Sequence, residues 1–154
     1  MKLLHNAAQP ANLFDFWVGD WELTWTDAKG NPLKGRNRIT KILDGAVIEE
    51  NFEALNGPTP RLKGRSLSVL QAGSKTWQQT WVDSSGSYIS LTAQTDGDKR
   101  IFQTAPIKRN GKEIIARMVF HNIQKDSFIW DWESTADGGK TWQSIWHIEY
   151  KRRR

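Results

Sequence analysis

The sequence predicts an all-β protein that folds as an antiparallel up-and-down barrel of about ten strands, with a short helical or irregular plug at its N-terminus. The first observation is the spacing of the nine tryptophans in this chain of 154 residues. Side chains at even spacing share one face of a strand, and most of these tryptophans form such pairs: Trp21/Trp25, Trp77/Trp81, Trp130/Trp132 and Trp142/Trp146. The second observation is regular punctuation by turn signals rich in Gly, Asn and Asp.

Nine turn signals delimit ten strands, which we expect at about residues 20–26, 33–41, 46–54, 62–70, 76–83, 87–94, 98–105, 112–121, 127–134 and 142–151. Every connection is short, so each strand should pair with its neighbour in the sequence. Closing such a meander into a barrel removes its exposed edges. The sequence therefore predicts one domain, residues 1–154. Residues 1–19 are expected to form an N-terminal arm or plug, and residues 151–154 a basic tail.

The hairpin around residues 124–126 sets its own register, because cross-strand partners point to the same face. Pairing Arg117 with Glu133 gathers the charges on one face. The same register makes the other face apolar through the pairs Phe120–Trp130 and Met118–Trp132, and it extends to Trp132–Ser144 and Trp130–Trp146.

The same reasoning sets the earlier hairpins. In the first, a large ring lies over a glycine when the pairs are Trp25–Gly35, Leu23–Asn37 and Trp21–Ile39. The next two give Asn37–Glu50 and Ile39–Ile48, then Trp81–Ile89, Gln79–Leu91 and Trp77–Ala93. In strand 62–70, either Ser66 and Ser68 or Arg65, Leu67 and Val69 could face inward.

These registers predict an interior of large aromatic rings with few polar groups. The predicted aromatic members are Trp21, Trp25, Phe52, Trp77, Trp81, Phe120, Trp130, Trp132, Trp142 and Trp146. The predicted polar members are Asn37, Glu50, Gln79, Gln103 and Ser144. The rings could fill the barrel or line a cavity inside it.

The segment Trp17-Val18-Gly19-Asp20-Trp21 resembles the signature of the calycins, which include lipocalins, fatty-acid-binding proteins and nitrobindin-like barrels. Gly19 lets the chain turn tightly into the first strand. The resemblance implies that Trp21 closes one end of the barrel and that Arg152 or Arg153 packs over its ring as a cation–π contact. The wider pattern, including Trp77–Asp83, is similar to a little-characterised bacterial calycin family, which implies the fold and leaves the function open.

Residues 135–142 resemble the Asp-box, Ser/Thr-x-Asp-x-Gly-x-Thr-Trp, of sialidase propellers. In that motif the aspartate holds backbone amides and the aromatic residue packs beneath the turn, which here implies structural roles for Asp137 and Trp142. A propeller needs repeated blades, so one copy predicts a stable hairpin and no glycosidase activity.

Glu50 is the strongest candidate for chemistry. In the expected register it is the charged side chain that points inward, and burial of an unpaired carboxylate is costly unless its pKa rises or a partner is present. It could anchor a ligand or act as a general acid or base. A register error of one residue would instead place Glu50 outside, with Glu49 or Asn51 inside.

Gln79, between Trp77 and Trp81, resembles a group that orients a ligand in an apolar cavity; it could equally be a core glutamine. The full set of predicted ligand-binding residues is Asn37, Glu50, Ser66, Gln79, Trp77, Trp81, Gln103, Phe120, Trp130, Trp132 and Trp146.

The histidines bear on cofactors. Nitrobindin-like barrels bind haem through one histidine, but the expected registers place His121 and His147 on the outer face, and His5 lies in the N-terminal arm. Asp131 and Glu133 are expected to be solvated on that outer face, and no cluster of ligands has metal-site spacing. We therefore expect no cofactor and no metal, with haem as an alternative.

Composition limits the partners. The chain has no cysteine, which excludes disulfides and thiolate sites. It shows neither a signal peptide nor a membrane span, so we expect a cytoplasmic protein without a membrane partner. Removing the four tail residues Lys151–Arg154 from the 22 basic residues leaves 18 against 17 acidic ones, a net charge of +1. Nucleic-acid binders carry basic residues as a stripe on the fold, so no nucleic-acid partner is expected.

The predicted function is binding of a small hydrophobic or aromatic molecule in the lumen of the barrel, by a monomer or a homodimer. One alternative is a cofactor-free isomerase, cyclase or hydrolase that uses Glu50 as its acid or base. Haem binding is the second alternative.

Overall fold

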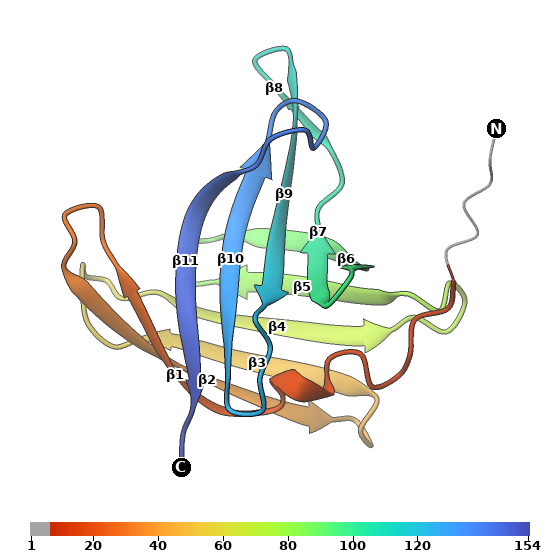
Figure 1. Ribbon diagram of the computed structural model, residues 1–154, viewed down its shortest axis with the longest axis horizontal. Coiled ribbons are helices and arrows are strands. Elements are labelled where there is room, and N and C mark those ends of the chain that lie inside the picture. The colour runs from red at the N-terminus through yellow and green to blue at the C-terminus, as the bar shows by residue number, and fades with distance from the viewer. Residues whose placement is uncertain (1–6) are drawn as a thin grey trace.

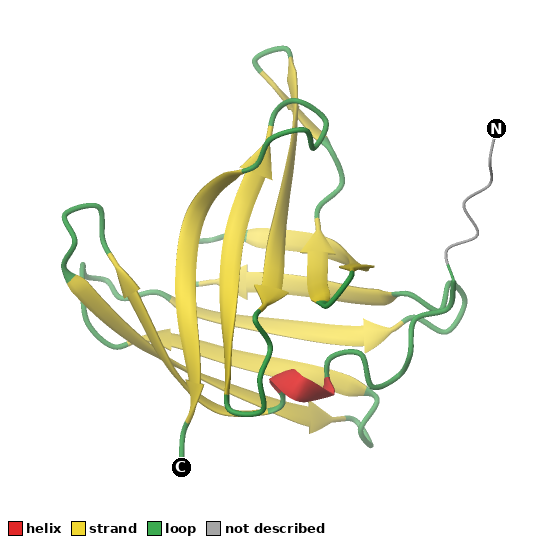
Figure 2. Cartoon of the chain, in the orientation of Figure 1, coloured by secondary structure: helices red, strands yellow, loops and turns green. Residues whose placement is uncertain are grey.

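The computed structural model describes residues 7–154 and is all-β (Figures 1 and 2). One 3-10 turn, η1 (Asp15–Trp17), precedes eleven strands. The strands are β1 (Gly19–Thr26), β2 (Pro32–Ile42), β3 (Val47–Ala54), β4 (Lys63–Leu70), β5 (Trp77–Asp83), β6 (Tyr88–Asp96), β7 (Lys99–Gln103), β8 (Ile107–Arg109), β9 (Lys112–His121), β10 (Ser127–Thr135) and β11 (Gln143–Arg152). Within the described residues, no helix has the length and apolar character needed to cross a membrane.

Ten of the strands form a closed antiparallel barrel. Each pairs with its neighbour from β1 to β7, β7 pairs with β9, and the series continues through β10 and β11 back to β1. The short β8 pairs only with the start of β9 and forms a hairpin that projects at the top of Figure 1. The predicted barrel is confirmed, with β8 as one additional strand where the expected strand 98–105 ends early.

The predicted registers are confirmed for β5–β6 and β9–β10, where Trp81 pairs with Ile89 and Arg117 pairs with Glu133. In the first two hairpins they are wrong by two residues. Trp21 pairs with Asn37, and Ile39 pairs with Glu50. A shift of two leaves each side chain on its expected face.

Each shift follows from the turn. Between β1 and β2, the Asp27 carboxylate accepts hydrogen bonds from the backbone N–H groups of Lys29 and Asn31 and holds a compact loop. Between β2 and β3, Leu43 and Asp44 both have positive φ, as hairpin turns of the primed types require. Trp25 still covers Gly35, because a Cβ atom there would lie 2.8 Å from the Trp25 ring.

The predicted pairing of β10 with β11 is wrong: Trp130 pairs with Ile148 rather than Trp146, and Trp132 pairs with Trp146 rather than Ser144. A bulge follows, because Glu133 pairs with Ser144 and Ile145 has no partner, so the face of every earlier residue in β11 is reversed. Ser144 and Trp142 were expected inside, with Ser144 opposite Trp132, and both lie on the outer side. The Trp142 ring instead packs against Arg117, whose Cζ lies 3.6 Å from the ring centroid.

Gln103 was also expected inside, and this prediction is wrong. Phe102 is the inward residue, fully buried and paired with Ala93 and Met118. Gln103 faces outward and accepts a hydrogen bond from Gln94. Ile101 and Phe102 are adjacent and lie on opposite faces of this strand, so both faces carry an apolar residue. The alternation of polar and apolar residues therefore does not show which face points inward.

Strand β4 faces inward through its serines. Ser66 and Ser68 are buried, whereas Leu67 and Val69 are exposed on the outer side. The small serines leave room inside the barrel, and Gly64 on the same face leaves still more.

The N-terminal segment fills one end of the barrel, as a plug was expected to do. Leu13, Phe14 and Trp17 are buried at the end where β9 leads into β10 (Figure 1). The Phe14 ring stacks on Phe102 with centroids 4.6 Å apart, and Trp17 packs edge-on against Phe120 at 5.3 Å. This end of the lumen is therefore solid.

The start of β1 is held by Arg152. Its guanidinium lies 4.3 Å from the centroid of the fully buried Trp21 ring, and it donates to the carbonyl oxygens of Phe16 and Val18. Gly19 has φ +146°, and a Cβ atom there would lie 2.2 Å from Arg152 Nη1. The expected cation–π contact is present, and Arg152 belongs to β11 rather than to a free tail.

The Asp-box segment forms the β10–β11 turn. Asp137 Oδ1 accepts hydrogen bonds from Thr135 Oγ1 and from the backbone N–H of Thr141. Its Oδ2 accepts a third hydrogen bond, from the Thr141 hydroxyl. The Thr141 hydroxyl bond first, and then the other two, lower the pKa of Asp137 to about 2. The Trp142 ring lies next to Gly139, where an added Cβ atom would be 3.6 Å from the ring, so both residues have the structural contacts that the resemblance implied.

Arg152→Ala should lower the free energy of unfolding by about 2–4 kcal/mol, because it removes the cation–π contact and several charge-assisted hydrogen bonds. Arg153→Ala is the matched control: its side chain is exposed, so the change should stay below about 0.5 kcal/mol. Urea unfolding of both variants measures the difference. Equal losses would contradict the assigned role of Arg152.

Candidate ligand-binding cavity

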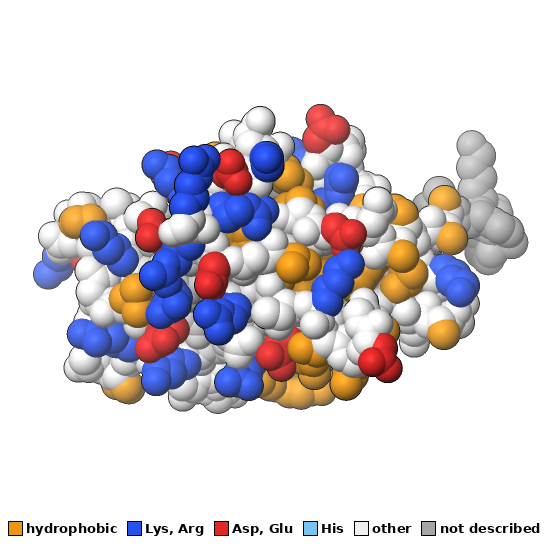
Figure 3. All heavy atoms as spheres, turned by 90° about the horizontal axis from the view of Figure 1, so that it is seen from below, with side chains coloured by type: hydrophobic (Ala, Val, Ile, Leu, Met, Phe, Trp, Pro, Cys, Tyr) orange, Lys and Arg blue, Asp and Glu red, His pale blue; other side chains and the backbone are white. Residues whose placement is uncertain are grey.

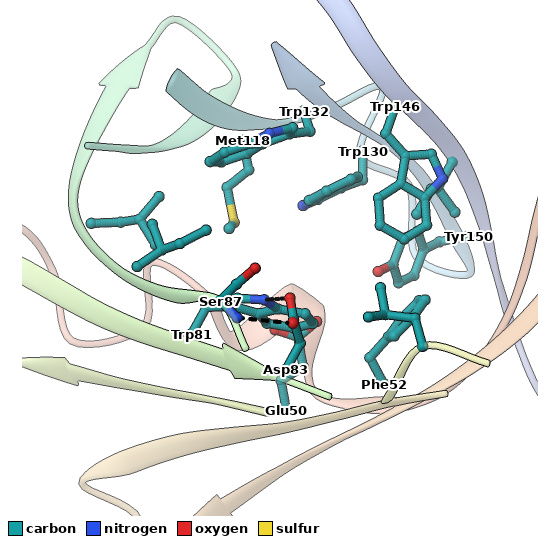
Figure 4. A pocket seen from close by; sticks show the side chains of 14 residues that line it. Glu50, Phe52, Trp81, Asp83, Ser87, Met118, Trp130, Trp132, Trp146 and Tyr150 are labelled. Carbon is teal, nitrogen blue, oxygen red and sulfur yellow. Dashed lines mark hydrogen bonds between the residues drawn. The ribbon is translucent and has the colours of Figure 1, made fainter. Parts of the chain in front are cut away.

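The half of the lumen that the plug leaves open contains a cavity of about 190 Å³. Aromatic and aliphatic side chains dominate its walls, with a few polar groups among them (Figure 4). The lining residues are Glu50, Phe52, Leu62, Trp81, Asp83, Ser87, Ile89, Leu91, Met118, Trp130, Trp132, Trp146, Ile148 and Tyr150.

Five of the predicted site residues line this cavity: Glu50, Trp81, Trp130, Trp132 and Trp146. The others lie elsewhere in the barrel. Trp77 and Phe120 pack against the plug through Phe14. Three buried polar residues lie behind the wall: Asn37, Ser66 and Gln79.

The ring of Trp146 packs nearly perpendicular to the rings of two other tryptophans. Trp146 meets Trp25 edge-on at 5.4 Å and Trp130 edge-on at 5.7 Å, and both contacts follow the preferred geometry of aromatic pairs. Trp81 lies over Gly64, where a Cβ atom would be 2.1 Å from the ring. Any larger residue at position 64 would displace Trp81 from the wall of the cavity.

Asp83 holds Trp81 from the other side. Its Oδ2 accepts a hydrogen bond of 2.8 Å from Trp81 Nε1 (Figure 4), and its Oδ1 accepts bonds from Ser85 and from the backbone N–H of Ser87. Partial burial raises the pKa of Asp83, but these hydrogen bonds outweigh it and lower the pKa to about 2. Asp83 is therefore ionised at neutral pH.

Glu50 lies inside the barrel, as expected, and is 6% exposed. Its Oε2 accepts a hydrogen bond of 2.6 Å from Asn37 Nδ2, and its Oε1 accepts one of 2.7 Å from the Ser66 hydroxyl. Burial raises the pKa of Glu50, and the two hydrogen bonds offset only part of this effect. No cation compensates the carboxylate among the residues that line the cavity.

Asn37 joins Glu50 to Tyr150. The same Nδ2 that donates to Glu50 also donates to the Tyr150 hydroxyl at 3.1 Å. Burial and the nearby Glu50 charge raise the pKa of Tyr150 well above its ordinary value, although the Asn37 bond lowers it somewhat. Tyr150 is thus a neutral phenol whose hydroxyl faces the cavity (Figure 4).

Gln79 is a core glutamine. It is 3% exposed, and its Nε2 donates to the Ser68 hydroxyl at 3.0 Å. Its Oε1 is buried without a partner among the described residues, but Gln79 does not line the cavity. A group that orients a ligand must reach the cavity, and the Gln79 side chain is not among those that line it.

The cavity does not fit a histidine-ligated haem. None of the lining residues is a histidine. His121 and His147 lie on the outer face, as expected, where they contact Asp131 Oδ2 at 2.5 Å and Oδ1 at 2.6 Å. His5 lies outside the described residues. Among residues 7–154, no group of three or more His, Cys, Asp or Glu could hold a metal ion.

The sequence reasoning did not place five lining residues inside the barrel: Leu62, Asp83, Ser87, Ile148 and Tyr150. Those that belong to strands carried a usable signal. Asp83 continues the inward alternation of Trp77, Gln79 and Trp81, and Tyr150 shares the parity of Trp146. Leu62 and Ser87 lie outside the strands, where alternation predicts nothing.

No protein-family model matches the chain, and no curated protein matches it. The function is therefore inferred from the cavity. The architecture, a closed ten-stranded antiparallel barrel, is consistent with the calycin-like barrel that the sequence predicts.

The raised pKa of Glu50 predicts a pH-dependent stability. The folded chain keeps this proton at pH values where the unfolded chain has released it, so stability falls as pH rises from 4.5 through the folded-state pKa. The slope is at most about 1.4 kcal/mol per pH unit. Glu50→Gln stays neutral, and its amide can accept from Asn37 and donate to Ser66. We expect the variant to match the parent below the unfolded-state pKa of 4.5 and to exceed it by a margin that grows until the pH passes the folded-state pKa of Glu50.

Urea unfolding at several pH values measures this difference. Glu49→Gln is the control, because Glu49 precedes Glu50 on β3 and faces outward, where it accepts a bond from Asn51. A constant difference between Glu50→Gln and the parent across this range would contradict a buried, raised-pKa Glu50.

Proposed function

We propose that the protein binds a small hydrophobic or aromatic molecule in the lumen of its barrel. The observation that carries this proposal is the cavity of about 190 Å³, which four tryptophans and the buried Glu50 line. Ligand sites are typically apolar hollows with few, well-placed polar groups. A cavity of about 150 Å³ is enough to hold benzene, so the expected ligand is one ring with a short substituent or an aliphatic molecule of similar size.

We further propose that the barrel is of the calycin type. Support comes from the Trp17–Trp21 segment, from Gly19 at a backbone angle that favours glycine, and from the guanidinium of Arg152 over the Trp21 ring. Barrels of that superfamily carry ligands in their lumen, which agrees with a cavity between the open end and the plug.

The first test is calorimetric titration with small apolar molecules, and Met118→Trp is the informative variant. The Met118 side chain points into the cavity (Figure 4), so an indole at this position should fill much of the space. We expect the affinity of any ligand found to fall at least about tenfold, equivalent to about 1.4 kcal/mol. Thermal unfolding verifies that the variant is folded.

Ile107→Trp is the control for this experiment. Ile107 is exposed on the β8 hairpin, so the substitution adds an indole without entering the lumen and should leave the affinity unchanged. Binding that survives Met118→Trp unchanged would place the ligand outside the cavity and contradict the proposal.

A second candidate function is a cofactor-free isomerase, cyclase or hydrolase. It is favoured by one observation: Glu50 lies at the cavity beside the Tyr150 hydroxyl, with Asn37 bonded to both. A carboxyl of raised pKa in a cleft is typical of a general acid or base. Glu50→Gln should then abolish turnover of a bound substrate by about a hundredfold or more while the substrate still binds. Weakened binding with no turnover by the parent protein would support a carrier instead.

A further inference from the structure

The side chains at the cavity wall that can carry a charge near neutral pH are both acids. They are Asp83, which is ionised, and Glu50, which takes a negative charge when it releases its proton; none of the lining residues is Lys, Arg or His. The chain as a whole carries 22 basic residues against 17 acidic ones, and basic side chains are spread over the outer surface (Figure 3). A carboxylate or phosphate ligand would meet only like charge inside the barrel, which disfavours anions.

The two acids differ in what they can still bind. A carboxylate has about four lone-pair sites. Asp83 already accepts four hydrogen bonds, from Trp81 Nε1, from the backbone N–H and hydroxyl of Ser85, and from the backbone N–H of Ser87. Three of these bonds fall on Oδ1 and the fourth holds the Trp81 ring at Oδ2. Asp83 therefore keeps at most one open acceptor site, on Oδ2, against one on each oxygen of Glu50.

Glu50 keeps open acceptor sites. Each of its oxygens accepts one hydrogen bond, from Asn37 or from Ser66, which leaves roughly one lone pair per oxygen. Glu50 also lines the cavity. An ammonium group is a compact cation with up to three N–H donors, so it matches both the charge and the free acceptors of this carboxylate.

The walls around Glu50 favour a cation as well. Trp130, Trp146, Phe52 and Tyr150 surround the space above it (Figure 4). The faces of such rings carry negative charge density, and aromatic cages recognise organic ammonium groups through it. The same rings provide the apolar surface that a hydrocarbon substituent needs.

We propose that the cavity selects small hydrophobic amines, with the ammonium group bound by Glu50 and the surrounding rings and the hydrocarbon group against Met118, Leu91 and Ile89. This inference rests on the proposed ligand-binding function and specifies its ligand class. An ammonium ligand pairs with the ionised form of Glu50, so a Glu50 that holds its proton in the empty cavity releases it when the cation binds. The ligand then supplies the counter-charge that none of the lining residues provides.

Three probes that share a phenylethyl group test the proposal: 2-phenylethylammonium, propylbenzene and 3-phenylpropanoate. They differ at one end, which carries an ammonium, a methyl or a carboxylate group. Calorimetry at neutral pH should give the ammonium compound an affinity at least about tenfold above propylbenzene, with 3-phenylpropanoate the weakest.

The Glu50→Gln variant assigns the preference to its residue. It should lose the advantage of the ammonium compound over propylbenzene while it still binds propylbenzene, which also shows that the variant is folded. Glu49→Gln removes the same charge one position away on the outer face and should keep the advantage. A preference that survives Glu50→Gln would overturn the role of Glu50.

The outcomes distinguish a failure of amine selection from a failure of ligand binding. Propylbenzene or 3-phenylpropanoate binding as tightly as the ammonium compound overturns amine selection and leaves the ligand-binding function standing. If none of the three probes binds, both the amine selection and the proposed function are wrong. The comparison on the unmodified protein decides between these results even where a variant fails to fold.

Discussion

The space inside a ten-stranded barrel is the constraint on which this structure depends. Side chains just fill the interior of an eight-stranded barrel, so two further strands leave volume that must be filled or left open. The N-terminal segment fills one end through Phe14 and Trp17. Arg152 ties that segment to the last strand by bonds to two of its carbonyl groups and by its position over Trp21. The depth of the remaining cavity is therefore set by the plug.

The polar cluster lies where the solid core meets the cavity. Asn37 is fully buried and donates to both Glu50 and Tyr150, while its own Oδ1 has no partner among the described residues. An apolar core of the same shape would avoid both that orphaned acceptor and the buried carboxylate. The proposed ligand would supply a reason for placing a carboxyl group at the cavity that protein stability alone does not supply.

The alternation of side chains could be predicted from the sequence in most strands, whereas the exact register could be predicted only in some hairpins, β5–β6 and β9–β10 among them. The errors of two residues around Asn37 and Glu50 left both side chains inside, because the faces of a strand repeat with period two. The bulge at Ile145 broke this rule and turned Trp142 outward. No glycine or proline marks that bulge in the sequence. The position of the plug inside the barrel could not be predicted either. Phe14 lies outside the strands, so the alternation of side chains does not indicate where it points.

Selectivity in so small a cavity must come from charge more than from shape. A hydrophobic wall distinguishes ligands that differ by one methylene by only about 1–3 kcal/mol. The four indoles would therefore accept many molecules of similar size. A buried carboxyl with open acceptor sites is different, because a ligand that fails to satisfy it leaves it unpaired in an apolar space. Under the proposed function, Glu50 is the group at this cavity that would reject an ill-matched ligand, and its hydrogen bonds with Asn37 and Ser66 hold it in position.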